Sequence, residues 1–180
     1  MSVHIALFRA INVGGRNMVA MAALKDMFAA AGFPQAGSLL QSGNIVFAGG
    51  TAKTSALEEL IEREIEKRFA LRADCFVRSA AEWNEALAHN PFAREAKTDP
   101  GRLHIMALKS KPKPAQLKAL RAAIKGRETV ELWMRHAYIY YPDGSGNSRL
   151  TPRLIEGLLE TRATGRNWNT AMKLQALASP

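Results

Sequence analysis

The chain has 180 residues, of which 47% are apolar and 23% are charged, and its formal net charge at pH 7 is +9. This composition is typical of a globular protein, and it excludes both a disordered chain and a fibrous one. The single cysteine, Cys75, excludes an intramolecular disulfide and a zinc site made only of cysteines.

No apolar run reaches the roughly 18–20 residues that a membrane-spanning helix needs. Residues 1–9 lack a basic segment followed by an apolar one, so they predict a first strand and not a signal peptide. A single cysteine is typical of a reducing compartment. We therefore expect a cytoplasmic protein with no membrane partner.

The first half of the chain predicts the element order β-α-β-β-α-β. Apolar runs predict strands at 3–11, 37–41, 44–48 and 72–78, and apolar residues at helical spacing predict helices at 18–31 and 55–69. Ser42-Gly43 predicts a two-residue hairpin turn. Two capping boxes, Ser55 to Glu58 and Ser79 to Glu82, predict helix starts, the second for a short helix that ends near residue 89.

The second half predicts the order β-α-β-β-α-α. Strands are predicted at 103–108, 128–134 and 137–141, and helices at 114–125, 151–160 and 169–177, with a loop at 161–167. Residues 90–102 are the predicted junction. We therefore expect an α+β fold of two ferredoxin-like (split β-α-β) halves with antiparallel sheets, in a domain at 1–90 and a second, basic domain at 91–180.

The positive charge lies in the second half. Residues 1–90 contain 9 Lys/Arg and 9 Asp/Glu, whereas residues 91–180 contain 16 Lys/Arg and 7 Asp/Glu. This asymmetry favours an anionic partner. A solvated basic face that keeps the protein soluble is the alternative explanation.

Five separated stretches resemble a known family and occur in its order. They are Arg9-Ala-Ile-Asn-Val-Gly-Gly15, Leu39-Leu-Gln-Ser-Gly-Asn-Ile-Val-Phe47, Asn90-Pro-Phe92, Ser148-Arg-Leu-Thr151 and Arg166-Asn-Trp-Asn-Thr170. Together they resemble the family of small bacterial proteins called domain of unknown function 1697, over about residues 3–177. Ala10 and Arg149 depart from it, at positions where the family usually has Gly and frequently has Lys. The resemblance implies a ferredoxin-like α+β fold, and it implies no activity.

Polar, glycine-rich loops near helix starts favour the binding of an anion. At 12–17, Gly14 and Gly15 can turn backbone N–H groups inward before a helix, and Arg16 adds a bidentate donor. Residues 166–170 place an arginine, two asparagines and a threonine at another helix start, and 41–44 and 141–149 are further polar loops. Turns and helix caps explain each loop by itself, and a hairpin turn is the favoured interpretation of 41–44.

We therefore predict that a small anionic ligand, either phosphorylated or a carboxylate, binds in a cleft between polar loops of the two halves. The predicted ligand-binding residues are Arg9, Asn12, Gly14, Gly15, Arg16, Asn17, Gln41, Asn44, Arg149, Arg166, Asn167 and Asn169.

The sequence contains no recognised catalytic or metal-binding pattern. The histidines at 4, 89, 104 and 136 are isolated, and neither a His-Glu-x-x-His motif nor a nucleophile elbow occurs. Cys75 lies in an apolar strand and is predicted to be buried. We predict no cofactor, no metal and no particular reaction.

A second hypothesis is sequence-independent binding of nucleic acid by a basic face at 109–127. Tyr138 and Tyr140 lie on one face of a predicted strand, where bases can stack, although both equally suit a core. No RNA-recognition consensus is present. A third hypothesis is a non-catalytic interaction module. The residues predicted for the basic face are Lys109, Lys111, Lys113, Lys118, Arg121 and Lys125.

Overall fold

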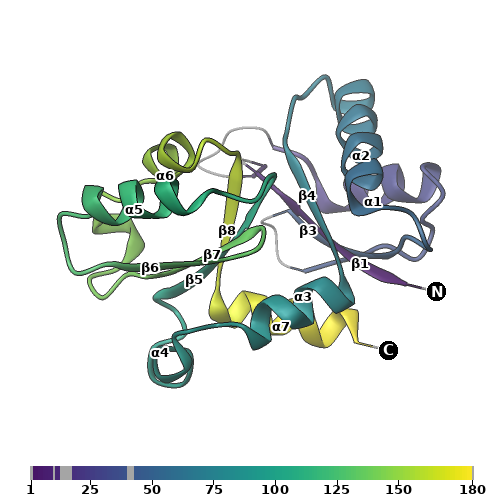
Figure 1. The fold of residues 1–180 in the computed structure, drawn as a ribbon. Helices are drawn as coiled ribbons and strands as arrows, with labels where there is room; N and C mark the ends of the chain where they lie inside the picture. The colour runs from purple at the N-terminus through teal and green to yellow at the C-terminus, as the bar shows by residue number, and fades with distance from the viewer. Residues whose placement is uncertain (1, 10, 13–17, 40–42, 180) are drawn as a thin grey trace. The chain divides into compact units, whose positions relative to one another are not determined.

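The structure is a computed structural model that describes residues 2–9, 11–12, 18–39 and 43–179. By its contacts the chain forms two compact units, one of Met1–Asn84 with Leu174–Pro180 and one of Glu85–Lys173. The chain passes from one unit to the other within α3 (Ala80–Ala88) and again within α7 (Trp168–Ala178) (Figure 1). The division predicted from the sequence, at residue 90, differs from this at both connections.

The first unit is built around a four-stranded antiparallel sheet with the order β2-β3-β1-β4. A helix lies between β1 and β2 along the chain, and another between β3 and β4, which is the split β-α-β element order. The elements are β1 (Val3–Phe8), α1 (Met21–Ala30), β2 (Gly37–Ser38), β3 (Asn44–Ala48), α2 (Thr54–Phe69) and β4 (Cys75–Ser79).

The core of this unit lies between one face of the sheet and helices α1 and α2. Strands β1, β3 and β4 contribute alternate residues, such as Ile45 and Phe47, because side chains of a strand point to opposite faces in turn. Helix α2 contributes Leu57, Ile61 and Ile65, whose spacing of four residues forms one stripe. The apolar stripe predicted for this helix from the sequence is therefore confirmed at these positions.

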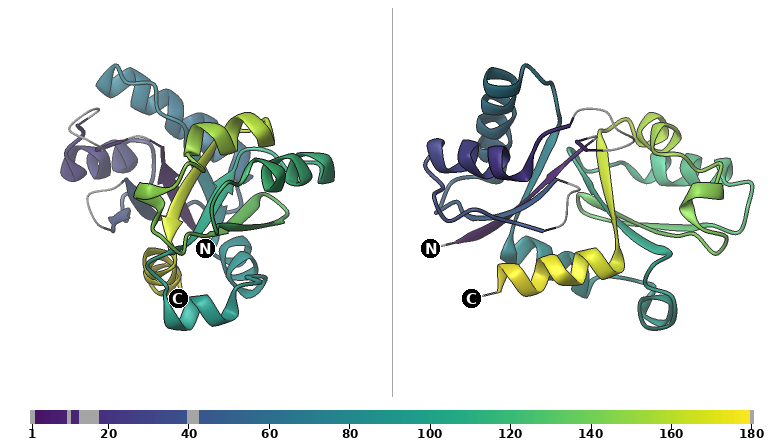
Figure 2. Two further views of the ribbon diagram at one scale, coloured as in Figure 1. Left: turned by 90° about the vertical axis from the view of Figure 1, so that its left-hand side faces the viewer. Right: turned by 180° about the vertical axis from the view of Figure 1, so that it is seen from behind.

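The second unit repeats this arrangement with the sheet order β6-β7-β5-β8, again antiparallel throughout. Its core lies between the sheet and helices α5 and α6, which are seen from two further sides in Figure 2. The elements are α4 (Ala93–Thr98), β5 (Leu103–Leu108), α5 (Pro114–Ala123), β6 (Thr129–Trp133), β7 (His136–Tyr140), the 3₁₀ turn η1 (Ser145–Asn147), α6 (Pro152–Leu159) and β8 (Ala163–Asn167).

The predicted α+β class with antiparallel sheets is confirmed, and the element order predicted for the second half is wrong. Residues 161–167 were expected to be a loop, but Ala163–Asn167 pairs with β5 from Leu108↔Ala163 to His104↔Asn167. The strand has only one apolar side chain, at Ala163, so it shows no hydrophobic alternation. The second unit therefore has the order β-α-β-β-α-β, followed by α7. Helix α4 was also missed, inside the predicted junction.

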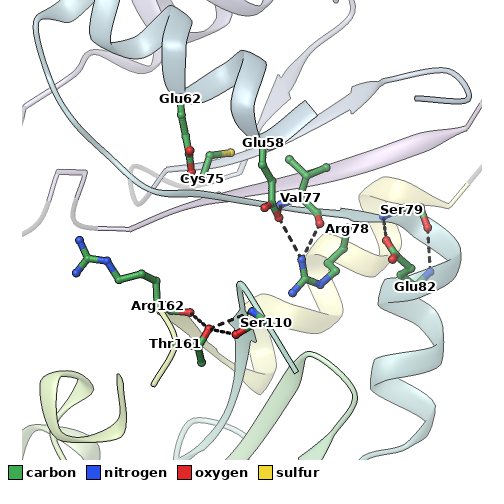
Figure 3. Close-up of polar contacts among 10 residues, drawn as sticks. All are labelled: Glu58, Glu62, Cys75, Val77, Arg78, Ser79, Glu82, Ser110, Thr161 and Arg162. Carbon is green, nitrogen blue, oxygen red and sulfur yellow. Dashed lines mark hydrogen bonds and ion pairs between the residues drawn. The ribbon is translucent and has the colours of Figure 1, made fainter. Parts of the chain in front are cut away.

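Helix α2 covers the open edge of β4 with two carboxylates. The Val77 N–H donates to Glu58 Oε1 over 2.9 Å, and the Cys75 N–H donates to Glu62 Oε1 over 2.8 Å (Figure 3). The Arg78 guanidinium lies 3.4 Å from the same Glu58 oxygen and donates to the Val77 carbonyl over 2.7 Å. Unpaired N–H groups at a sheet edge can pair with a further strand, so these carboxylates occupy the donors that such a strand would use.

The same arrangement occurs in the second unit, where the Ala163 N–H of β8 donates to Glu156 Oε1 of α6 over 2.9 Å. In both units a glutamate of the helix just before the edge strand, α2 or α6, therefore accepts from an N–H group of that strand that points away from the sheet. The capping box predicted at Ser55 is wrong, because α2 begins at Thr54 with Lys53 as its N-cap, so Ser55 lies inside the helix. Helix α2 has no side-chain hydrogen bond at its N-cap, and the Glu58 carboxylate reaches the sheet instead of the helix start.

Two other predicted helix starts are confirmed. Ser79 Oγ accepts from the Glu82 N–H and Glu82 Oε2 accepts from the Ser79 N–H, which is the reciprocal capping box predicted for α3 (Figure 3). Thr151 Oγ1 accepts from the Leu154 N–H at the start of α6. The predicted turn at Ser42-Gly43 falls partly on residues 40–42, which lie outside the described residues. Cys75 is buried, as predicted.

Candidate functional site

A pocket of about 220 Å³ lies within the second unit. Two segments form it: residues 125–128, which follow α5 and lead into β6, and residues 143–149, which follow β7 and include η1. The lining residues are Lys125, Gly126, Glu128, Asp143, Asn147, Ser148 and Arg149.

Two polar links join these segments. Arg127 donates from Nε to Asp143 Oδ2 over 3.1 Å, and its terminal nitrogen bonds the other carboxylate oxygen. This hydrogen-bonded pairing holds the pKa of Asp143 below its usual range and raises that of Arg127. On the other side, Ser148 Oγ donates to Glu128 Oε1 and accepts from the Leu150 N–H over 3.0 Å. These bonds fix the loop after β7 against the segment before β6.

The loop after β7 owes its shape to short polar residues and glycine. Gly144 has φ +86°, a left-handed conformation that side chains with a Cβ rarely adopt. Asn147 Nδ2 donates to the Asp143 carbonyl over 3.2 Å and so closes the turn that contains η1. The loop then presents Ser148 and Arg149 before the N-cap of α6.

The pocket brings together two cations and one carboxylate that has no cationic partner. Among the described residues, neither Lys125 nor Arg149 takes part in an ion pair, and both are exposed. Glu128 Oε2 is buried and has no hydrogen-bond partner in the described part of the chain. It lies under Gly126, where an added Cβ would stand 2.5 Å from this oxygen. A buried acceptor without a donor costs free energy, so it is a group that a bound molecule can satisfy.

Of the predicted ligand-binding residues, Arg149 lies in this pocket. Arg166, Asn167 and Asn169 of the same unit do not line it. Arg166 donates to Thr164 Oγ1 over 3.0 Å and to the Gly165 carbonyl over 2.8 Å, and desolvation lowers its pKa to about 10, so it stays charged at neutral pH. Asn167 Oδ1 accepts from the Thr170 N–H over 2.9 Å and so caps α7, which is the structural alternative to ligand contact.

The described candidates of the first unit make contacts that maintain its own fold. Arg9 lies 3.6 Å from the Asp74 carboxylate. Asn12, at φ +56°, holds Val19 by accepting from its N–H over 2.7 Å and donating to its carbonyl over 2.8 Å. Asn44 is buried and donates to the Leu39 carbonyl over 3.0 Å. Gly14, Gly15, Arg16, Asn17 and Gln41 lie outside the described residues.

Sequence reasoning missed Glu128 and Asp143 as members of a site. The sequence predicts Lys125 only as a member of the basic face. It predicts the loop 141–149 as a polar loop but gives no sign that residues 125–128 lie beside it. One signal was present: Glu128 is the first acidic residue after a stretch from Pro100 to Arg127 that has eight basic residues and no acidic one. An acidic residue at the end of a basic stretch, two residues after Gly126, differs in charge from its neighbours and indicates a specific role.

The basic face predicted at 109–127, which includes α5, is only partly as the sequence indicates. Lys111, Lys113 and Lys118 are exposed, but Arg121 forms an ion pair with Glu131 of β6. Tyr138 is buried, and its hydroxyl donates to the Ala86 carbonyl over 2.6 Å, so it offers no surface for a stacked base. The expectation of a stacking platform at Tyr138 is therefore wrong, and the alternative, a core residue, is correct.

No group of three or more His, Cys, Asp or Glu side chains in the described residues is placed to hold a metal ion. Over the same part of the chain, no helix combines the length and the apolar character that crossing a membrane requires.

Comparisons with known proteins agree with the fold and leave the function open. No curated protein matches the sequence significantly. A solved structure, described as that of the conserved bacterial protein SP0830 from Streptococcus pneumoniae, is similar to this chain with a TM-score of 0.78 and 20% sequence identity, over 99% of each chain. The family described as "Protein of unknown function (DUF1697)" matches residues 1–138. The chain therefore belongs to the DUF1697 family of proteins of unknown function.

Proposed function

We propose that the protein binds a small anionic ligand, and that the pocket of the second unit holds the anionic group. The observation that carries this proposal is the pair Lys125 and Arg149, which line one pocket from two different segments and have no ion-pair partner among the described residues. Charge-assisted hydrogen bonds from two such cations are among the stronger polar contacts that a protein offers.

The size of the pocket limits the ligand to a small molecule. A volume of about 220 Å³ is below the range of roughly 300–1,000 Å³ that is usual for drug-sized ligands. A phosphate or carboxylate group with a few further atoms fits this volume, whereas a dinucleotide does not. Arg166, Asn167 and Asn169 do not line this pocket. Their contribution to ligand binding therefore stays a separate prediction from the sequence, as does that of Arg9, Asn12, Gly14, Gly15, Arg16, Asn17, Gln41 and Asn44. Arg16→Ala and Arg166→Ala test them separately.

The test begins with a thermal-shift screen against nucleotides, sugar phosphates, carboxylates and inorganic phosphate, and calorimetric titration then measures the strongest binder. We expect Lys125→Ala and Arg149→Ala each to weaken binding by about tenfold, the effect of losing one charge-assisted bond. Lys118→Ala is the matched control, because Lys118 is an exposed lysine of α5 that does not line the pocket. Equal weakening by all three variants would argue against a defined site.

The alternative proposal is sequence-independent binding of nucleic acid by the exposed lysines of the second unit. Lys111, Lys113, Lys118 and Lys125 are all exposed, which is the observation in its favour. It predicts that a short RNA raises the melting temperature at low salt and loses this effect at physiological salt, because binding to phosphates releases counterions. The pocket proposal predicts binding of one small anion that persists at physiological salt. For both, we propose a cytoplasmic location, since a single cysteine suits a reducing compartment.

A further inference from the structure

We propose that the ligand is a phosphate ester that carries a hydrogen-bond donor, a hydroxyl or an ammonium group, close to its phosphate, and that this donor binds Glu128. The inference rests on the proposed function and names the class of its ligand. It follows from the side chains that line the pocket, taken with the one buried acceptor that lacks a donor there.

The two cations favour a phosphate over a carboxylate. Lys125 and Arg149 come from opposite segments of the pocket, so one group that contacts both must offer oxygens in more than one direction. A phosphate monoester has three terminal oxygens and carries about −1.5 to −2 charges at neutral pH. A carboxylate carries a single charge and two oxygens in one plane, which one arginine satisfies.

Glu128 makes a plain phosphate a poor ligand. Its carboxylate lines the same pocket, and like charges a few ångströms apart repel each other. Asp143 adds little to this repulsion, because Arg127 pairs with it. A donor on the ligand reverses the effect of Glu128, since an O–H or N–H group that binds a carboxylate forms a charge-assisted hydrogen bond.

The free position on Glu128 is Oε2. Ser148 Oγ already donates to Oε1, so the carboxylate is held at one end and lacks a donor at the other. Oε2 lies beside Gly126, where an added Cβ would stand 2.5 Å away, and Glu128 itself lines the pocket. Residues 125–127 lie between α5 and β6 and belong to neither a helix nor a strand. A side chain at 126 would occupy the position of the carboxylate, so glycine keeps Glu128 in place.

Calorimetric titration of the full chain with three probes tests the inference: propyl phosphate, glycerol 3-phosphate and phosphoethanolamine. The first has no donor on its carbon chain, the second has hydroxyls and the third has an ammonium group. We expect at least one of the two donor-bearing probes to bind about tenfold more tightly than propyl phosphate, and the tighter of the two identifies the donor.

The variant Glu128→Gln separates this inference from the proposed function. Glutamine keeps an acceptor for Ser148 and removes the negative charge. We expect it to reduce the preference for the donor-bearing probe to less than threefold while propyl phosphate binds as well as before or better. Glu131→Gln, a glutamate outside the pocket, should leave the preference unchanged.

Four results would overturn the inference. One result is that propyl phosphate binds the wild type as tightly as both other probes, and another is that Glu128→Gln keeps the preference. In either case Glu128 does not bind a donor of the ligand, while the proposed function stands. If Lys125→Ala leaves the binding of all three probes unchanged, the proposed function itself fails and the inference fails with it. If none of the three probes binds, the inference fails, and the wider screen decides the proposed function.

Discussion

Replacing Glu58 by alanine is expected to destabilise the first unit by about 3 kcal/mol. The substitution removes the acceptor of the Val77 N–H, at 2.9 Å, and the carboxylate that lies 3.4 Å from the Arg78 guanidinium. The side chains of this pair are only 1% and 7% exposed for Arg78 and Glu58, so water does not replace the lost partner easily.

The magnitude follows from the burial of the pair. Removing one partner of a buried ion pair costs about 3–5 kcal/mol, because the other charge stays buried. The lower end applies here, since Arg78 keeps its hydrogen bond to the Val77 carbonyl. A loss of this size lowers the melting temperature by about 6–12 °C, at 2–4 °C per kcal/mol for a chain of this length. Glu58→Gln keeps an acceptor for Val77 and should therefore fall between the wild type and Glu58→Ala.

Urea denaturation followed by circular dichroism measures the change, and calorimetry shows whether the two units melt together. Glu59→Ala is the matched control, because Glu59 is the next residue of the same helix and is exposed. A surface substitution of this kind should change stability by no more than about 0.5 kcal/mol. Equal stability of the Glu58→Ala and Glu59→Ala variants would refute the role given to the buried pair.

Three further predictions concern the second unit. Gly126→Ala places a Cβ where the Glu128 carboxylate lies. Titration should therefore show that the preference for donor-bearing phosphates is lost, while the melting temperature changes little. An unchanged preference would contradict this geometry. Thr151→Ala removes the N-cap of α6 and should cost about 1 kcal/mol in urea denaturation, whereas Thr151→Ser should not. Burial lowers the pKa of His104 below 6.5, so the folded state favours the neutral imidazole. The contribution of His104 to the free energy of unfolding is therefore complete above pH 6.5 and is lost as the pH falls through the lowered pKa. Melting temperatures between pH 7 and pH 5 should therefore fall less in His104→Gln than in the wild type.

Much of the fold follows from local pattern, and the exceptions have physical causes. The apolar spacing of Leu57, Ile61 and Ile65 predicts a helix because one face of it must meet the sheet. Strand β8 was missed because an edge strand with one paired side needs little apolar alternation, and its polar residues suggested a ligand loop instead. Ser79 to Glu82 and Ser55 to Glu58 have the same spacing, yet only the first forms a capping box. Helix α2 begins at Thr54, so Ser55 is not its N-cap, and Glu58 reaches the edge of β4 instead.

The candidate site was harder to predict than the fold. The loop that carries Arg149 was recognised as polar and rich in glycine, which local sequence shows. Its partner segment at 125–128 is separated from it by two strands, and only the pairing of β6 with β7 brings the two segments together. Asn12, Asn44 and Asn167 were good candidates by residue type, and each satisfies backbone groups of its own unit, a role that a sequence alone does not separate from ligand binding.

The carboxylates of Glu58 and Glu62, which extend from α2 to the edge of β4, also limit where residues can be inserted into the chain. At about 1.5 Å of rise per residue, Glu58 and Glu62 stand about 6 Å apart along α2, close to the roughly 6.6–6.8 Å between alternate residues of a strand. One residue inserted between them would turn Glu62 by about 100° away from Cys75 and leave that N–H without its acceptor. The connections at 49–53 and 70–74 belong to no helix or strand, so an insertion there does not rotate Glu62 relative to Glu58. Insertions of one or two residues should therefore be tolerated there, and a single insertion at 59–61 should not.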